Sequence, residues 1–317
     1  MDVPCLLCGF QPLTSGFPVS GDQKEGKYFG SCPRCKTGHI LPVRTAEESV
    51  EAHEELLHGE LASKFSRGWA TSVLDVFRWY RARTIHRRVS QNAYILDYGC
   101  GNGRMLFHLS RMGNYSLFGT ELPGQQAVVA AATSGATVYT NGIPPDSPLF
   151  GNTDYISMFH VLEHLPNPSE VLDEMHQMLK PGGIILIALP NIRSVQFKLF
   201  RSDWLHLDPD RHISFPMANQ LRIWFETKGY TLLRHHTLSL EQNPFGMVQS
   251  ILNRISRQRD LLFHAFKGTA NIRQKPVLLL HWLLLVTTLP LFSITDRILN
   301  IFRLGATTTL VFRKAQP

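Results

Sequence analysis

Four cysteines near the amino terminus are arranged in two Cys-x-x-Cys pairs: Cys5, Cys8, Cys32 and Cys35. Four thiolates at tetrahedral geometry form a closed structural zinc site, and zinc supplies folding free energy that a segment of about 40 residues lacks. Two redox motifs or four unrelated thiols are the alternatives, but in a reducing compartment this pattern favours metal over disulfides. Residues 1–43 are therefore expected to be a zinc-binding module, with His39 as a surface residue or a substitute ligand.

A glycine-rich stretch, LDYGCGNG at residues 96–103, lies between an apolar strand and a helix. Its glycines Gly99, Gly101 and Gly103 permit a tight turn and let a ligand press against the backbone, while the first N–H groups of the helix attract a carboxylate. A plain glycine turn is the alternative for this motif alone. About 20 residues later, Glu121 ends the next strand, where a carboxylate can accept both hydroxyls of a ribose. The GxGxG spacing differs from the GxGxxG of dinucleotide sites and suits a ligand without a pyrophosphate.

The elements that must position these residues alternate between strand and helix from Ala93 onward, which predicts a parallel sheet. Strands are expected at 93–98, 115–121, 136–140, 154–159, 183–190 and 230–238, and helices at 103–112, 124–134, 168–180 and 217–228. The segment TTTLVFRK, 307–314, is expected as a final edge strand. The fold class is therefore α/β, with a doubly wound Rossmann-like sheet. The expected division is a module at 1–43, a helical linker at 44–90, the nucleotide-binding domain at 91–239, a helical insertion at 240–305 and the last strand at 306–317.

Three motifs together resemble the class I S-adenosylmethionine (SAM) dependent methyltransferases. LDYGCGNG resembles the first motif of that family, FHVLEHLPNP at 159–168 follows the fourth strand, and LKPGG at 179–183 precedes the fifth, all in the family's order and spacing. The resemblance covers roughly residues 61–238 and the last strand. It implies a methyltransferase sheet, SAM as cofactor and methyl transfer as the activity.

The resemblance also implies cofactor-binding residues, all at the carboxyl ends of strands, where open α/β sheets bind ligands. Ordered from the methionine part of SAM through the ribose and the adenine to the acceptor side, they are Asp97, Gly99 and Gly101; Glu121; Asn141 and Gly142; and His160. At Asn141 this chain departs from the acidic residue that the family usually places near the adenine.

The acceptor side is assigned to the stretch DWLHLDPDRHISFP, 203–216, which resembles the WxxLDPxRHxxxF stretch of many bacterial members of the family. An oxygen acceptor needs a nearby base to remove its proton. His212 is the candidate base, with Asp208 or Asp210 to orient it. Candidates for binding an acidic group and for lining the pocket lie in the same stretch: Arg211, Trp204 and His206. A structural loop with solvated charges is the alternative.

Residues 240–305 break the alternation of strands and helices. Six basic residues, offset only by Asp260, precede the apolar run VLLLHWLLLVTTLPLF at 277–292: Arg254, Arg257, Arg259, Lys267, Arg273 and Lys275. As a helix this run is roughly 24 Å long, short of the ~30 Å hydrocarbon core of a bilayer. Two alternatives stand side by side: peripheral contact of residues 254–292 with an anionic membrane, and a buried cap on the sheet or on a second subunit of a homodimer.

The composition is that of a globular protein, with 44% hydrophobic and 18% charged residues and a net charge of +7. No signal peptide is visible, so a cytoplasmic protein, peripheral at the inner membrane face, is expected. The expected function is SAM-dependent methyl transfer to a small-molecule or lipid-linked acceptor, a sugar hydroxyl or carboxyl group. An RNA methyltransferase with a zinc-ribbon clamp and a catalytically inactive SAM-fold scaffold are the alternatives. Nucleic acid is not the expected partner, because FHVLEH replaces an Asn-Pro-Pro-Tyr type stretch and residues 1–43 interleave few aromatic and basic residues.

Overall fold

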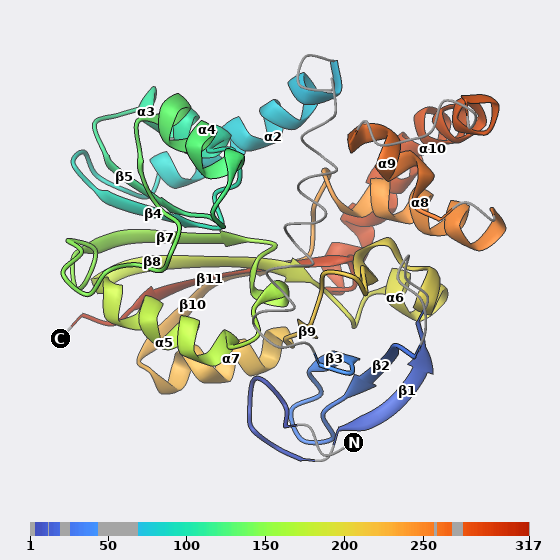
Figure 1. Ribbon diagram of the computed structural model, residues 1–317, viewed down its shortest axis with the longest axis horizontal. Coiled ribbons are helices and arrows are strands. Elements are labelled where there is room, and N and C mark those ends of the chain that lie inside the picture. The colour runs from blue at the N-terminus through green and yellow to red at the C-terminus, as the bar shows by residue number, and fades with distance from the viewer. Residues whose placement is uncertain are drawn as a thin grey trace.

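The computed structural model describes residues 4–11, 13–19, 26–43, 69–256, 259–267 and 275–316. A seven-stranded main sheet carries helices on both faces, and a smaller four-stranded sheet lies beyond the end of strand β8 (Leu179–Pro190) (Figure 1). Of the expected helical linker at 44–90, the helix α2 (Trp69–His86) is described, and residues 44–68 lie outside the described residues.

The main sheet has the strand order β10-β11-β8-β7-β4-β5-β6. The strands are β4 (Tyr94–Tyr98), β5 (Ser116–Thr120), β6 (Thr137–Tyr139), β7 (Thr153–Phe159), β8 (Leu179–Pro190), β10 (Tyr230–His236) and β11 (Thr307–Lys314). Strands β4 to β8 pair in parallel, and β11 runs antiparallel to both of its neighbours. The expected doubly wound α/β fold is confirmed.

Successive residues of the central strands face opposite cores, because side chains alternate along a strand. Ile95 and Tyr155 pack on one face, and Leu96 and Ile156 pack on the other. The first face is covered by α2, α3 (Arg104–Ser110) and α4 (Gln125–Ser134), and the second by α5 (Pro168–Met178) and α7 (Ala218–Thr227) (Figure 1). With both faces covered, the parallel strands carry nearly continuous apolar runs.

The expectation that TTTLVFRK forms an edge strand is wrong. β11 lies between β8 and β10, with Leu310 opposite Ile187 on one side and His235 on the other. Leu310 and Val311 are buried in the two opposite cores, and a strand that is apolar on both faces suits the interior of a sheet. The outer position belongs to β10, which carries Arg234 and His235 along that edge.

The smaller sheet joins the amino-terminal cysteine module to the predicted acceptor segment. It consists of β1 (Thr14–Pro18), β2 (Tyr28–Ser31), β3 (Gly38–Leu41) and β9 (Ser214–Phe215), all antiparallel. His39 pairs with Ser214, and the N–H of Ile40 donates to the carbonyl of Ile213 over 3.0 Å. His39 is therefore fully buried in this sheet rather than on the surface as expected.

The insertion forms α8 (Asn243–Ile255), α9 (Leu261–Lys267) and α10 (Lys275–Ile301), which lie beyond the same end of the main sheet as β1–β3 (Figure 1). α10 continues through Pro290, so the helix is longer than the expected run and spans about 40 Å. One face packs against α8 and buries Leu285. Near the far end, Asp296 accepts hydrogen bonds from Asn243 and Ser239.

Candidate functional site

The glycine turn lies between β4 and α3. Gly99, Gly101 and Gly103 have φ values of 74°, 55° and 70°, in the left-handed region that glycine adopts without steric cost. A Cβ on Gly99 would lie 2.3 Å from the side chain of Val161, and one on Gly103 would lie 2.7 Å from the Cα of Ala130. Around Gly101, by contrast, the nearest atom of the described residues would be 3.7 Å from a Cβ. The turn is thus packed at its two ends and open at its middle glycine.

Glu121 follows β5 and closes over this turn. Its Oε2 accepts a hydrogen bond from the N–H of Gly101 at 2.6 Å, and its Oε1 accepts one from the N–H of Leu122 at 3.1 Å. Burial raises the pKa of Glu121, while these two bonds lower it. Each carboxylate oxygen keeps a further lone pair, so the group can still accept hydrogen bonds from hydroxyls.

Asp97 lies near the end of β4 and is 5% exposed. The hydroxyl of Ser157 donates to its Oδ1 at 2.8 Å. Burial raises the pKa of Asp97 to about 7, although the hydrogen bond from Ser157 and the charge of Arg81 both act to lower it. The guanidinium of Arg81 lies 4.4 Å from the ring centre of Phe159 and pairs with Glu241. This carboxyl therefore sits between its proton-bound and ionised forms near neutral pH.

Two arginines of α2 belong to this region and were not predicted as site residues. Arg78 and Arg81 are three residues apart, so they share one face of the helix. Burial lowers the pKa of Arg78, and the charge of Glu241 opposes that shift. Their spacing of three residues in a helical segment was the available sequence signal.

The remaining predicted cofactor residues extend along the same end of the sheet. Asn141 and Gly142 are exposed just after β6. His160 follows β7 with a φ of 57°, its N–H donates to the carbonyl of Ala188, and its Nδ1 lies 3.3 Å from Oε1 of Glu163. All the predicted cofactor residues thus lie at the carboxyl ends of β4 to β7.

The acceptor segment adopts a different set of contacts from the one expected. Nδ1 of His212 lies 3.0 Å from the carbonyl oxygen of His206, so a backbone carbonyl rather than Asp208 orients the ring. Asp208 pairs with Arg211 instead, and Lys27 of the amino-terminal segment pairs with Asp210. Burial lowers the pKa of His212 to about 4, which leaves the imidazole neutral at physiological pH.

Two expected pocket walls are core residues. Trp204 is fully buried, and its ring centre lies 5.3 Å from that of Phe197 in the core beneath the smaller sheet. His206 is 8% exposed, and burial lowers its pKa to about 3. The aromatic and apolar character of this stretch therefore serves packing, and the expectation of pocket walls is wrong for Trp204.

Sequence reasoning also missed Glu163 and His164, which form the end of the 3₁₀ helix η2 (Leu162–His164). The carboxylate of Glu163 is fully buried beside the imidazoles of His160, His164 and His212. Burial raises the pKa of Glu163, but the hydrogen bond with His160 and the neighbouring imidazoles outweigh it and lower the pKa to about 2. The N–H of Ile213 donates to the carbonyl of Glu163 at 2.8 Å. This bond joins the turn after β7 to the acceptor segment.

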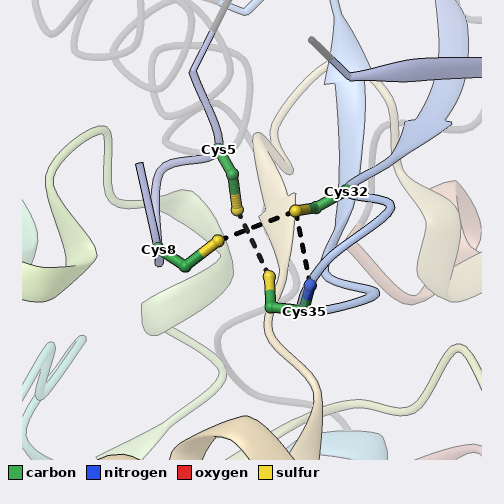
Figure 2. Close-up of side chains that lie close together, drawn as sticks. All are labelled: Cys5, Cys8, Cys32 and Cys35. Atoms are coloured by element: carbon green, nitrogen blue, oxygen red, sulfur yellow. Dashed lines mark hydrogen bonds between the residues drawn. The ribbon is translucent and has the colours of Figure 1, made fainter. Parts of the chain in front are cut away.

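The four predicted zinc ligands come together in one cluster (Figure 2). The Sγ atoms of Cys5 and Cys35 are 3.4 Å apart, and those of Cys8 and Cys32 are 3.6 Å apart. These separations exceed a disulfide bond of about 2 Å. Sulfur atoms about 2.3 Å from a tetrahedral zinc ion lie roughly 3.8 Å from each other. The spacing therefore fits a zinc site, and three of the four cysteines are buried.

Comparisons with known proteins agree with this architecture. A family described as "Methyltransferase domain" matches residues 44–235. The chain is 29% identical over 147 residues to a ubiquinone biosynthesis O-methyltransferase of Colwellia psychrerythraea, a match that spans 43% of this chain and 59% of that protein. It is 21% identical over 232 residues to a tRNA U34 carboxymethyltransferase of Idiomarina loihiensis, spanning 65% of this chain and 70% of that one. Among solved structures, phosphoethanolamine N-methyltransferase 2 of Haemonchus contortus, in complex with S-adenosyl-L-methionine, is 14% identical, covers 75% of this chain and 53% of its own, and has a TM-score of 0.49.

Proposed function

Because the chain belongs to the methyltransferase-domain family and is a SAM-dependent methyltransferase, we propose that it methylates an oxygen atom of a small-molecule or lipid-linked acceptor, a sugar hydroxyl or carboxyl group. The observation that carries the proposal is the buried imidazole of His212, whose lowered pKa keeps the ring neutral and whose Nδ1 is held by the carbonyl of His206, since a hydroxyl acceptor needs a base. The relative from Colwellia is named for O-methyl transfer, which also favours oxygen.

SAM fits the residues around the glycine turn. The open side of Gly101 leaves room for the methionine part, and Glu121 would accept the ribose hydroxyls. Asp97 would attract the α-ammonium group, and Arg81 would attract the carboxylate. Bound SAM supplies an electrophilic methyl group on a sulfonium, and the chain holds it in line with the acceptor oxygen.

His212 would act on the acceptor proton. Its Nδ1–H donates to a carbonyl, so Nε2 carries the lone pair that a general base needs. His160, at the end of β7 and 23% exposed at its side chain, would lie between this ring and the cofactor. Asp208 would hold Arg211 in place rather than act on His212.

The four cysteines would bind one structural zinc ion. The ion would fix both Cys-x-x-Cys loops and thereby β3, whose pairing with β9 supports the acceptor segment. The zinc site would in this way serve acceptor binding without touching the acceptor.

A membrane would present a lipid-linked acceptor. In the described part of the chain, α10 is the helix long and apolar enough to cross a bilayer, and 11% of its apolar window is buried. Its inner face is packed on α8, however, so contact along the membrane surface fits better than a span. Large apolar side chains are exposed along the outer face, among them Leu279, Leu283, Val286, Ile294 and Ile298. Of the six basic residues expected to face lipid, Arg254 and Arg259 bind the protein at Asp203 and Ser202, and the side chains of Arg257, Lys267, Arg273 and Lys275 lie outside the described residues.

RNA is the second candidate acceptor, because the relative from Idiomarina is named for a tRNA carboxymethyl transfer. The test is to incubate the protein with SAM labelled in its methyl group and three acceptor pools: a lipid extract, soluble glycans and total tRNA. Label in either of the first two supports the proposal, and label in tRNA alone overturns it. Mild base then distinguishes the acceptor groups, because a methyl ester on a carboxyl is released as methanol and a methyl ether on a hydroxyl is retained.

A further inference from the structure

Three side chains of metal-binding type meet beside the turn after β7. Glu163 and His164 end η2, and His212 comes from the segment before β9, so the cluster joins segments almost 50 residues apart. One ligand atom from each residue lies within 4.8 Å of the other two. The ring centres of His164 and His212 are 4.6 Å apart.

Hydrogen bonds to backbone carbonyls fix both imidazoles in one tautomer. Nδ1 of His164 lies 3.2 Å from the carbonyl oxygen of Arg211, and Nδ1 of His212 lies 3.0 Å from that of His206. A carbonyl oxygen only accepts, so each Nδ1 carries the proton and each Nε2 carries the lone pair. Metal-binding histidines are held in this way, with one ring nitrogen donating to a carbonyl and the other facing the ion.

The carboxylate of Glu163 supplies an independent observation. The side chain is fully buried, and its Oε1 lies 3.3 Å from Nδ1 of His160. Its Oε2 is buried and has no hydrogen-bond partner among the described residues. A buried carboxylate oxygen without a partner is costly unless a cation or a donor satisfies it.

We propose that Glu163, His164 and His212 bind a divalent transition-metal ion. Two imidazoles and one carboxylate suit Zn²⁺, Fe²⁺, Mn²⁺ or Co²⁺ and leave further coordination positions open. The three side chains would close by small rotations around an ion about 2 Å from each ligand atom. This set is chemically distinct from the four thiolates of the amino-terminal cluster.

The ion would lie next to the cofactor site, because Val161 of the same turn packs against Gly99. With an ion bound, Nε2 of His212 is a metal ligand and no longer a free base. The cation takes over that role, because it polarises an acceptor hydroxyl and eases the loss of its proton. The O–H bond then breaks and the proton leaves to solvent; the oxygen forms a bond to the methyl carbon, and the electron pair of the broken C–S bond stays on sulfur as a neutral thioether. This use of the ion rests on the proposed function, whereas the binding of the ion does not.

The experiment titrates Co²⁺ alone into protein whose cysteine site is already loaded with zinc, and records visible absorbance and binding heat. We compare wild type with Glu163→Gln, which keeps the side-chain shape, with His212→Ala, and with His176→Ala as a control. His176 lies on α5 and bonds to Tyr230, outside the cluster. Circular dichroism of each zinc-loaded protein, recorded before Co²⁺ is added, verifies folding.

Wild type and His176→Ala are expected to take up one Co²⁺ with the weak absorbance of nitrogen and oxygen ligands and no thiolate charge-transfer band. Glu163→Gln and His212→Ala should bind Co²⁺ at least tenfold more weakly. Equal uptake by all four proteins, or no uptake by folded wild type at millimolar Co²⁺, overturns the proposal. Since no SAM or acceptor is present, Co²⁺ uptake by a protein that fails to methylate the lipid and glycan pools would refute the proposed function alone.

Discussion

The N–H of Ile40 and the carbonyl oxygen of Ile213 are 3.0 Å apart, and this hydrogen bond joins the cysteine module to the acceptor segment. The next bond in the row runs from the N–H of Ile213 to the carbonyl of Glu163. Three segments that are distant in sequence are thereby held side by side: β3 of the cysteine module, the stretch that carries His212 and the turn after β7. Loss of the cysteine cluster should therefore alter the structure of the acceptor segment more than that of the glycine turn.

The first prediction follows from this connection. Cys32→Ser should remove zinc and loosen β3, which would shift His212 by loss of its support, and turnover should fall by about 100-fold. The affinity for SAM should stay within about twofold, because the glycine turn packs against α4 and Val161 rather than against the module. Elemental analysis, calorimetry with SAM and an initial-rate assay measure the three quantities. Full activity in a zinc-free variant would contradict a supporting role for the module.

The second prediction concerns the cofactor contacts. Glu121→Ala removes the ribose acceptor and the partner of the Gly101 N–H, and should weaken SAM binding about 10- to 100-fold. Gly101→Val places a branched side chain in the open space and strains a φ of 55°, so binding should be abolished. Glu170→Ala, which removes an exposed carboxylate bonded to Asn167, is the matched control. Calorimetry that finds unchanged binding in both site variants would refute the assignment.

The third prediction is a pH dependence set by Asp97, whose pKa burial raises to about 7. Ionised Asp97 attracts the α-ammonium of SAM, so below pH 7 binding must release a proton, and the affinity should be about tenfold weaker at pH 5.5 than at pH 7. The ammonium group stays charged throughout this range. The sign for stability is opposite: native Asp97 keeps a proton that the unfolded chain releases above 3.8, so its contribution to stability falls as pH rises toward 7.

Calorimetry at several pH values checks this dependence. Asp97→Asn should bind SAM weakly with a flat pH profile, whereas Glu121→Gln should bind weakly and keep the slope. A slope that persists in Asp97→Asn would assign the titration to another group.

Much of this site could be predicted from short, local patterns. Within the stretch from Leu96 to Gly103, three closely spaced residues adopt a left-handed backbone conformation. Glycine favours that conformation, so its presence in the sequence indicates the turn. The pairing of His39 with Ser214 could not be predicted, because β9 has two residues and no periodicity, and its partner lies about 175 residues away. The burial of His39 and the meeting of Glu163 with His212 depend on that same long-range pairing. The position of β11 likewise depends on long-range pairing: its apolar residues on both faces suit an interior strand, but they do not specify β8 and β10 as its neighbours.

The fourth prediction separates the two faces of α10. Leu283 and Val286 are 61% and 65% exposed, whereas Leu285 between them is 6% exposed and packs on α8. Changing Leu283 and Val286 together to Asp should leave stability nearly unchanged and abolish co-sedimentation with anionic vesicles. Leu285→Asp should destabilise the fold by about 3 kcal/mol or more, because it buries an unpaired charge.

Vesicle sedimentation and chemical denaturation measure these two effects. The membrane proposal would be contradicted if the wild-type protein does not co-sediment with vesicles but elutes as a dimer in size-exclusion chromatography, and if the change of Leu283 and Val286 abolishes that dimer. The exposed face would then belong to a contact with a second copy of the chain.

The place of β11 between β8 and β10 has a consequence for how the protein is made. The ribosome delivers β8 and β10 before β11, so the edge of β8 opposite β7 and the strand β10 both lack their neighbour until the residues of β11 emerge. At ~5–20 residues per second this interval lasts for several seconds or longer. During it the growing chain presents an unpaired apolar strand, which is a site for chaperone binding and for aggregation. The nascent protein is therefore expected to need shielding until β11 is inserted.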